Sequence, residues 1–248
     1  VNGDEEISSP GSRSTISRVA STQDAVFSFE GSGSDGGLRL ATSGIGSAYL
    51  TVEGRSSHAG ARPEGGINAL YELAHQILQL KDLSQNDKGL KLNWTVAQAG
   101  TNRNVIPARA TAQADARALR VADFDQLQAA LQERVRKQLV TDAKVQLTFE
   151  VRRPPLEATP ASRRLAAHGQ AIYDELGMPM QIAEVATGGG TDAAFAALQT
   201  KGAVVEGFGL SGFGAHSNDA EYVQIGSIGP RLYLATRLVM DVAQDKLR

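Results

Sequence analysis

Carboxylates within the first thirty residues are the first candidates for chemistry. Asp4, Glu5 and Glu6 form an acidic triplet ahead of a turn rich in Ser, Pro and Gly. On its own, such a triplet is typical of a solvated charge cluster or of the acids favoured at a helix N-terminus. If the segment is extended, adjacent side chains project to different sides. One glutamate can then bind a metal ion while its neighbour faces the water bound to that ion.

Glu30 and His216 extend the set of possible metal ligands. Residues 25–30 (AVFSFE) predict a short apolar strand ending on Glu30, where a parallel α/β sheet places its site residues. His216 lies in the loop GFGAHS, whose small residues let the ring project freely, although a lone histidine is more often a satisfied polar residue. The chain has no Cys, so any zinc must be held by His and carboxylates.

Four further residues have types suited to catalysis or to substrate binding. His58 lies in the loop SSHAGARP after a predicted strand, a position that argues against a core role. Gly190 ends a run of three glycines that lets a peptide-like substrate approach the backbone; neither GxGxxG nor the P-loop lysine pattern is present. Arg117 and Arg153 lie near predicted strand ends. Most such arginines are surface residues, but both forks suit a carboxylate if they face the catalytic domain.

The elements that must position these residues fall into two groups. Residues 47–153 follow the order strand, helix, strand, strand, helix, strand, which is the order of a ferredoxin-like sandwich. Pro154 and Pro155 end the last strand, so we expect an inserted α+β domain at residues 44–154. The predicted strands are 47–54, 90–100, 109–119 and 144–153, and the predicted helices are 67–80 and 124–139.

The flanking segments, residues 1–43 and 155–248, are predicted to form one discontinuous α/β domain around this insert. Strands are expected at 25–30 and 203–208, with helices at 161–176, after the turn TGGGTD, and at 228–242. Two strands and three helices are few for such a domain. We therefore expect its sheet to be incomplete.

Composition limits the partners. With 42% hydrophobic residues and 21% charged residues in 248, the chain has the make-up of a soluble globular protein. A net charge of -2 without a basic cluster argues against nucleic acid, and no apolar run approaches the ~20 residues that cross a bilayer. The start VNGDEEISSPGS has neither Met nor a signal sequence, so we expect a processed or truncated N-terminus, with cytoplasm and periplasm both open.

Taken in order, the motifs resemble those of a known family. They are DEEISSPGSR, VFSFE, TSGIGSAYLTVEGRSSHAGARPEGGINAL, NWTVAQAGTNRNVIPA, ADAR, RRPP, TGGGTDAAFAAL and GFGAHSNDAEYV. Together they span essentially the whole chain. They resemble the zinc metallopeptidase family of glutamate carboxypeptidases, aminoacylases and succinyl-diaminopimelate desuccinylases, most closely the bacterial folate-cleaving glutamate carboxypeptidases.

The resemblance implies a fold and a set of roles. The fold is a zinc-peptidase catalytic domain with an inserted dimerisation domain, and the complete active site holds two zinc ions. Glu5 would be the general base, Glu6 and Glu30 would each bind one zinc, His216 would complete a metal sphere, and His58 of the partner subunit would stabilise the oxyanion.

The resemblance also implies substrate contacts and partners. Asn104 and Arg117 would hold the terminal carboxylate of the substrate, Arg153 would assist, and Gly190 would line the site. Catalysis would require a homodimer built through the inserted domain. Family members also use an upstream His-x-Asp pair and a bridging Asp, so we expect a segment before Val1, in a longer chain or as a complementing fragment. Without it, this chain alone would lack part of its metal site.

Three functions remain open on the sequence alone. The first is zinc-dependent hydrolysis of an amide bond, releasing a C-terminal amino acid such as glutamate from an N-acyl or peptide substrate. The second is another amidohydrolase of the aminoacylase or desuccinylase type, which differs in the pocket for the substrate side chain. The third is a non-catalytic dimerisation module that lacks the upstream metal ligands.

Overall fold

The computed structural model describes residues 2–186, 188–217 and 219–246 and divides into two units. Unit 1 comprises Val1–Ser43 and Arg153–Arg248, and unit 2 comprises Gly44–Arg152. Each unit has its own apolar core. Within the described residues, no helix combines the length and the apolar character needed to cross a membrane.

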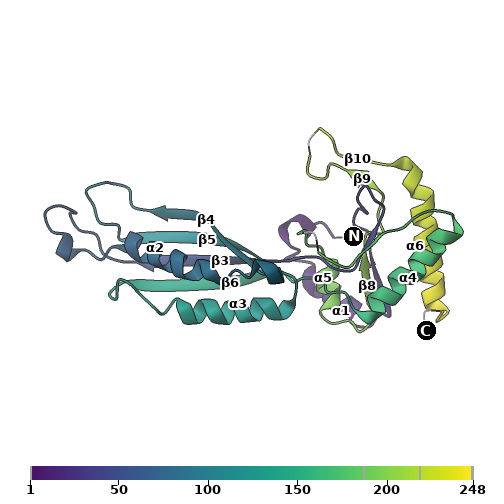
Figure 1. Cartoon of the computed structure of the whole chain (residues 1–248), viewed down its shortest axis with the longest axis horizontal. Helices are drawn as coiled ribbons and strands as arrows, with labels where there is room; N and C mark the ends of the chain where they lie inside the picture. Colours follow the sequence, from purple (N-terminus) through teal and green to yellow (C-terminus); the bar gives the residue numbers. More distant parts are fainter. Residues whose placement is uncertain (1, 187, 218, 247–248) are drawn as a thin grey trace. The chain divides into compact units, whose positions relative to one another are not determined.

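Unit 2 is a four-stranded sheet covered by two helices (Figure 1). The strands have the order β4-β5-β3-β6, with β5 antiparallel to both β3 and β4. Numbered along the unit, this is the order 2-3-1-4, so the predicted ferredoxin-like topology is confirmed. The elements are β3 (Gly44–Glu53), α2 (Ala69–Leu80), β4 (Lys91–Ala99), β5 (Arg109–Ala118), α3 (Val121–Arg134) and β6 (Lys144–Arg153).

Strict alternation in β5 explains how the helices pack on this sheet. Its five alanines from Ala110 to Ala118 are all buried, while the residues between them are polar and more exposed. Small side chains let α2 and α3 approach the strand closely, and Leu73, Phe124 and Leu127 fill the space between helices and sheet. One face of the sheet therefore makes the core of unit 2.

Helix α3 differs from the predicted span of 124–139, because it begins at Val121 and ends at Arg134. The chain then turns so that the backbone amides of Leu139 and Val140 donate to the buried carboxylate of Glu72, at 2.8 and 2.7 Å. Continuing the helix would leave that carboxylate without these donors. A buried acid on α2 thus sets where α3 stops.

Unit 1 has a four-stranded sheet with the order β1-β8-β2-β7. β1 (Ala25–Ser28) runs parallel to β8 (Ala203–Glu206), whereas β2 (Leu38–Arg39) is antiparallel to β8 and parallel to β7 (Ile182–Ala183). A separate hairpin pairs β9 (Gly212–Phe213) with β10 (Tyr222–Val223). The sequence predicts β1 and β8 but not the two-residue strands, which are too short to show a period.

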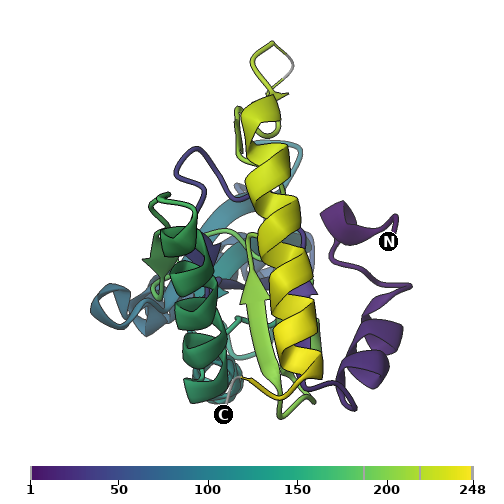
Figure 2. The same ribbon diagram turned by 90° about the vertical axis from the view of Figure 1, so that its right-hand side faces the viewer.

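Helices cover both faces of this sheet. On one face α4 (Pro160–Glu175) and α6 (Ile228–Ala243) lie side by side (Figure 2), packing through Leu165, Leu234 and Leu238. On the other face α1 (Arg13–Ala20) contacts α5 (Ala193–Ala197). Helix α1 was not predicted, although its sequence RSTISRVA has apolar residues at Ile16, Val19 and Ala20. The described 3-10 turns are Glu5–Ile7, Pro63–Gly65, Lys81–Leu83, Asn86–Lys88 and Ile225–Ser227.

Candidate active site

Two acids lie at the carboxyl ends of the parallel strands β1 and β8. Glu206 is the last residue of β8 and pairs in register with Ser28, and Glu30 follows two residues beyond Ser28. The backbone of Glu30 is fixed by Gly209, whose amide donates to the Glu30 carbonyl at 2.9 Å. A Cβ on Gly209 would lie 2.6 Å from that oxygen, so only glycine fits the approach. This edge is where parallel sheets bind ligands.

Glu5 and Glu6 lie in the 3-10 turn Glu5–Ile7 and not in an extended segment. The cause is the preceding Asp4. Its carboxylate accepts hydrogen bonds from the amides of Gly11 and Ser12, at 2.8 and 3.2 Å, and from the Ser12 hydroxyl at 2.5 Å. These bonds close the segment into a loop. They also lower the pKa of Asp4, with the Ser12 hydroxyl making the largest contribution.

Arg153 gathers several parts of unit 1 around one guanidinium group. The side chain is only 3% exposed. Nη1 donates to the Glu5 carboxylate and, at 2.7 Å, to the Gly190 carbonyl, while Nη2 donates to the Glu5 carbonyl at 2.5 Å. The Asp192 carboxylate lies 3.6 Å from Nη2. The structure thus brings together Glu5, Arg153 and Gly190, with the guanidinium bound to the chain's own acceptors. That Arg153 assists in binding the substrate carboxylate stays a prediction.

Several acidic side chains lie close enough to Glu30 for their negative charges to affect it. The pKa of Glu30 is raised, first by burial and then by the charges of Glu5, Asp192 and Glu6, while Arg153 opposes the rise. His216 lies near this group: its Nε2 is 3.7 Å from Oε1 of Glu6, and both side chains are exposed. Carboxylates and imidazole are the donors that zinc accepts where no thiolate exists.

The donor types therefore fit a divalent cation, although the arrangement is open. Across residues 2–186, 188–217 and 219–246, no three His, Asp or Glu side chains converge at ligand distance. Glu6 and His216 form a close pair, and Glu30 interacts with Glu6 through charge. The ligand roles predicted for Glu6, Glu30 and His216 stay predictions.

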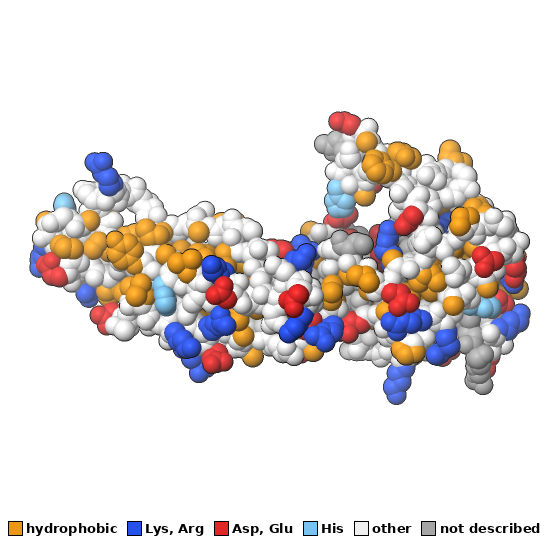
Figure 3. All heavy atoms as spheres, viewed as in Figure 1, with side chains coloured by type: hydrophobic (Ala, Val, Ile, Leu, Met, Phe, Trp, Pro, Cys, Tyr) orange, Lys and Arg blue, Asp and Glu red, His pale blue; other side chains and the backbone are white. Residues whose placement is uncertain are grey.

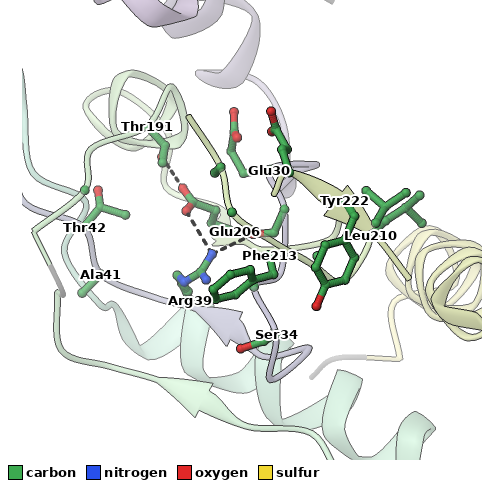
Figure 4. A pocket seen from close by; sticks show the side chains of 18 residues that line it. Glu30, Ser34, Arg39, Ala41, Thr42, Thr191, Glu206, Leu210, Phe213 and Tyr222 are labelled. Atoms are coloured by element: carbon green, nitrogen blue, oxygen red, sulfur yellow. Dashed lines mark hydrogen bonds and ion pairs between the residues drawn. The ribbon is translucent and has the colours of Figure 1, made fainter. Parts of the chain in front are cut away.

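A pocket of about 510 Å³ opens beside Glu30 and contains a network that sequence reasoning missed (Figure 4). Glu206, 2% exposed, accepts a hydrogen bond from the Thr191 hydroxyl, and its other oxygen lies 4.0 Å from Nη1 of Arg39. Burial raises the pKa of Glu206 to about 7, against the lowering effects of Thr191 and Arg39. The signal was present in the sequence, because AVVE is an apolar strand ending on an acid, like AVFSFE.

His58 and Asn104 belong to neighbouring loops of unit 2. His58 forms an isolated bridge with Val105, and the amide of Ala59 donates to the Asn104 carbonyl at 2.8 Å. Nδ1 of His58 accepts hydrogen bonds from the amides of Gly60 and Ala61, at 3.2 and 3.0 Å. In the neutral ring the proton then lies on Nε2, which leaves that nitrogen as a donor.

Arg117 lies at the other end of the same sheet. It is near the end of β5, opposite Ile45 of β3, and its guanidinium pairs with Asp115 at 2.9 Å. The loop that carries Asn104 precedes the first residue of β5, Arg109. The strand between them separates the two positions by roughly 25 Å. Asn104 and Arg117 can therefore hold one carboxylate only if they come from different copies of the chain.

The sequence is similar to known hydrolases. Residues 40–143 match the M20 peptidase dimerisation domain. The chain is 44% identical over 246 residues to carboxypeptidase G2 of a Pseudomonas species, an alignment that covers 99% of the chain and 59% of that protein. The chain thus spans less than two thirds of this relative. A stretch covering 26% of the chain and 15% of the relative is 38% identical to indole-3-acetyl-aspartic acid hydrolase of Enterobacter agglomerans.

Solved structures with a similar fold include two that are described as peptidases. Aminopeptidase PepT of Bacillus cereus has a TM-score of 0.75 at 18% identity, over 95% of this chain and 60% of its own. The Bacillus subtilis YXEP protein, described as a dinuclear metal binding peptidase from the M20 family, has a TM-score of 0.71 at 16% identity. That match covers 96% of this chain and 62% of the other. At such identities the likeness establishes the fold, and the predicted α/β class with an inserted dimerisation domain is confirmed.

Proposed function

Because the chain carries an M20 peptidase dimerisation domain and resembles carboxypeptidase G2 over 99% of its length, we propose that it acts in a zinc-dependent carboxypeptidase. The reaction is hydrolysis of an amide bond that releases a C-terminal amino acid, glutamate, from an N-acyl or peptide substrate. The observation that carries the proposal is the grouping of acids in unit 1, where Arg153 binds the Glu5 carboxylate and Oε1 of the adjacent Glu6 lies 3.7 Å from Nε2 of His216.

Glu6, Glu30 and His216 would hold the metal. Three donors shared between two zinc ions leave positions for water, substrate and other ligands. Bound zinc lowers the pKa of a water molecule toward ~7 and polarises an amide carbonyl. Burial is the largest cause of the raised pKa of Glu30, and the charges of Glu5, Asp192 and Glu6 add to it; a cation placed among these carboxylates would offset the contribution of the charges.

Glu5 would be the general base. It would remove the proton from the attacking water and deliver it to the departing amine, which restores the carboxylate for the next turnover. Arg153 fixes the position of Glu5 by binding both its carboxylate and its carbonyl. The unused lone pairs of the Glu5 carboxylate remain available for the water.

His58 would stabilise the oxyanion through Nε2, the nitrogen that its backbone contacts leave protonated. A single donor to an oxyanion contributes roughly 3 to 4 kcal/mol in comparable sites. Asn104 and Arg117 would bind the terminal carboxylate of the substrate. Because their positions lie at opposite ends of unit 2, the two residues would come from different copies of the chain, and we assign Asn104, like His58, to the partner copy.

The homodimer would form along the β4 edge of unit 2. β4 is a terminal strand of its sheet, with Val96 exposed. Helix α2 contacts β4 and also leaves Leu70, Tyr71 and Leu78 exposed, and Figure 3 shows hydrophobic side chains gathered over this helix. The outer edge of β4, with an apolar helix face beside it, is suited to pairing with the same elements of a second copy around a twofold axis.

The test uses the natural full-length protein. It is dialysed against zinc, its metal content is measured, and release of glutamate from N-benzoyl-glutamate and pteroyl-glutamate is followed. We expect about two zinc ions in each protein chain. We also expect a turnover that Glu5→Gln reduces at least ~1000-fold without loss of zinc.

The controls distinguish the other functions. N-acetyl amino acids and N-succinyl-diaminopimelate are assayed in parallel, and preferred cleavage of either assigns the aminoacylase or desuccinylase activity instead. Full zinc occupancy with no cleavage of any of these amides would refute the proposed activity and favour the dimerisation module.

A further inference from the structure

The Glu206 carboxyl group is buried, its pKa is raised in part by the charge of the proposed catalytic base Glu5, and it has no role in the mechanism above. It lies at the end of β8, directly opposite Arg39 in the antiparallel pair with β2. Its hydrogen-bond partner is the Thr191 hydroxyl. Only 2% of Glu206 is exposed, and burying a polar group costs free energy unless hydrogen bonds replace those it made to water.

Thr191 ends the glycine turn that carries Gly190. Gly188 has φ +110, and a Cβ on Gly188 or Gly189 would meet nothing within 4 Å, so the space beside these two glycines is open. Two polar contacts hold the turn on either side of Gly190. The amide of Ser43 donates to the Gly189 carbonyl at 2.8 Å, and the Thr191 side chain donates to Glu206.

The Gly190 carbonyl lies between these two anchors and accepts from Nη1 of Arg153 at 2.7 Å. The same nitrogen donates to the Glu5 carboxylate. A continuous chain of contacts therefore runs from Glu206 through Thr191 and the Gly190 carbonyl to Arg153 and Glu5. If the turn shifts, Arg153 loses one of its acceptors and can rotate away from Glu5.

We propose that Glu206 and Thr191 are positioning residues for the proposed hydrolysis, because their hydrogen bond fixes the Gly190 carbonyl that holds Arg153 against Glu5. The inference rests on the proposed function, in which Glu5 is the base. Neither residue touches substrate in this role. Their effect is on the orientation of the Glu5 carboxylate, and so on the chemical step rather than on substrate affinity.

The environment of Glu206 indicates which replacement preserves this role. Burial is the largest influence on its pKa, and the charges of Glu30 and Glu5 act in the same direction. Glutamine keeps the carbonyl oxygen that accepts from Thr191 and introduces no charge. Alanine removes the acceptor and leaves a cavity. Likewise Thr191→Ser keeps the hydroxyl that donates to Glu206. Thr191→Val keeps the shape of the side chain but removes this hydroxyl.

The experiment compares these four variants in the zinc-loaded, full-length protein. Measured quantities are kcat and KM for N-benzoyl-glutamate and the hydrogen exchange of peptides that contain Glu5 and Gly190. We expect Thr191→Val and Glu206→Ala to lower kcat at least ~10-fold, with KM changing less than ~3-fold. Thr191→Ser and Glu206→Gln should stay within ~3-fold of the unmodified protein in kcat.

Hydrogen exchange gives a readout that does not depend on turnover. Thr191→Val should accelerate exchange in both peptides, whereas Thr191→Ser should not. Wild-type kcat and exchange in Thr191→Val would overturn the inference, as would an equal loss in Glu206→Gln and Glu206→Ala. If the unmodified protein cleaves no N-acyl-glutamate, the proposed function fails, while the exchange comparison still decides the positioning role.

Discussion

Arg153 places one positive charge among carboxylates and carbonyls that would otherwise repel one another. Glu5, Asp192 and the Gly190 carbonyl all face its guanidinium. Lysine would supply the charge but not the planar fork that reaches three acceptors at once. The residue therefore acts on both the stability of unit 1 and the geometry of the proposed base.

Replacing Arg153 should be costly, because the acids would be left facing one another. We expect Arg153→Met to lower the free energy of unfolding by about 3 kcal/mol, the effect of breaking a buried ion pair from one side. Urea denaturation at neutral pH measures it.

The matched control is Arg163→Met, which breaks another arginine–carboxylate pair, with Glu184. Both of its side chains are 48% exposed. That variant should lose less than ~1 kcal/mol. Equal losses in the two variants would contradict the assigned role of burial.

Glu206 should make stability depend on pH. Its pKa is raised from 4.5 to about 7 in the folded protein, so the folded state binds the proton more tightly than the unfolded state. Stability contributed by this group is therefore greatest below pH 4.5, falls as the pH rises toward 7, and changes no further above it.

The expected loss over that range is up to about 3 kcal/mol. Urea titrations at several pH values between 4 and 8 would measure it, with Glu206→Gln as the comparison. The glutamine variant cannot titrate, so its stability should fall less steeply between pH 4.5 and 7. Parallel pH profiles for the two proteins would show that Glu206 does not hold a raised pKa.

Among the elements, the segment after β8 acts as a support for Glu30. Gly209 approaches so closely that a methyl group would lie 2.6 Å from the carbonyl oxygens of Phe29 and Glu30. Any side chain at residue 209 would therefore displace the backbone of Phe29 and Glu30, and Glu30 is a proposed metal ligand.

Gly209→Ala should push this segment away from its position. We expect a loss of about 1–3 kcal/mol in stability from overpacking and a zinc affinity lowered at least ~10-fold. Chemical denaturation and zinc titration in the full-length protein check the two effects.

Gly229→Ala provides the control, because a Cβ at Gly229 in the first turn of α6 meets nothing within 4 Å. Alanine also favours the helix, so this variant should keep wild-type zinc affinity and equal or slightly greater stability. Unaltered zinc affinity in Gly209→Ala would mean that the Glu30 backbone tolerates displacement.

Element by element, the sequence was most informative where periodicity was long. The ten-residue strands β3, β5 and β6 alternate over their full length and were predicted within a few residues. Helix α3 was misplaced because its end depends on Glu72, which is remote in sequence. At the site, the Glu5–Ile7 turn depends on contacts of Asp4 with Gly11 and Ser12, and the burial of Glu206 depends on the neighbours that folding brings to it. Neither follows from residue type.

On the scale of the whole molecule, the proposed dimer depends on which edge of the unit 2 sheet is used. Val96 on β4 is 44% exposed, and Val151 on β6, the opposite edge, is 38% exposed. We expect Val96→Lys to produce monomers in analytical ultracentrifugation, because a charged edge strand resists pairing. Val151→Lys should remain dimeric. Dissociation by the second variant alone would assign the interface to β6.

Exchange of protomers tests whether His58 acts in the neighbouring copy. Glu5→Gln and His58→Ala, each inactive as a homodimer, are co-expressed. A mixed dimer contains one site with both residues intact if His58 comes from the partner copy, so random pairing should restore about a quarter of wild-type activity. Activity no higher than that of the two separate variants would place His58 and Glu5 in the same copy's site.

The insertion of unit 2 between β1 and β8 also determines the order in which these strands are synthesised. β1 pairs with β8, and all of unit 2 lies between them in the chain. Translation adds ~5–20 residues per second, so β1 leaves the ribosome on the order of ten seconds before its partner strand exists. Unit 2 is contiguous and can fold in that interval from its own local contacts. The strand leading to Glu30 is therefore made well before β8, so the contact between these two strands forms only after the whole of unit 2 has been synthesised.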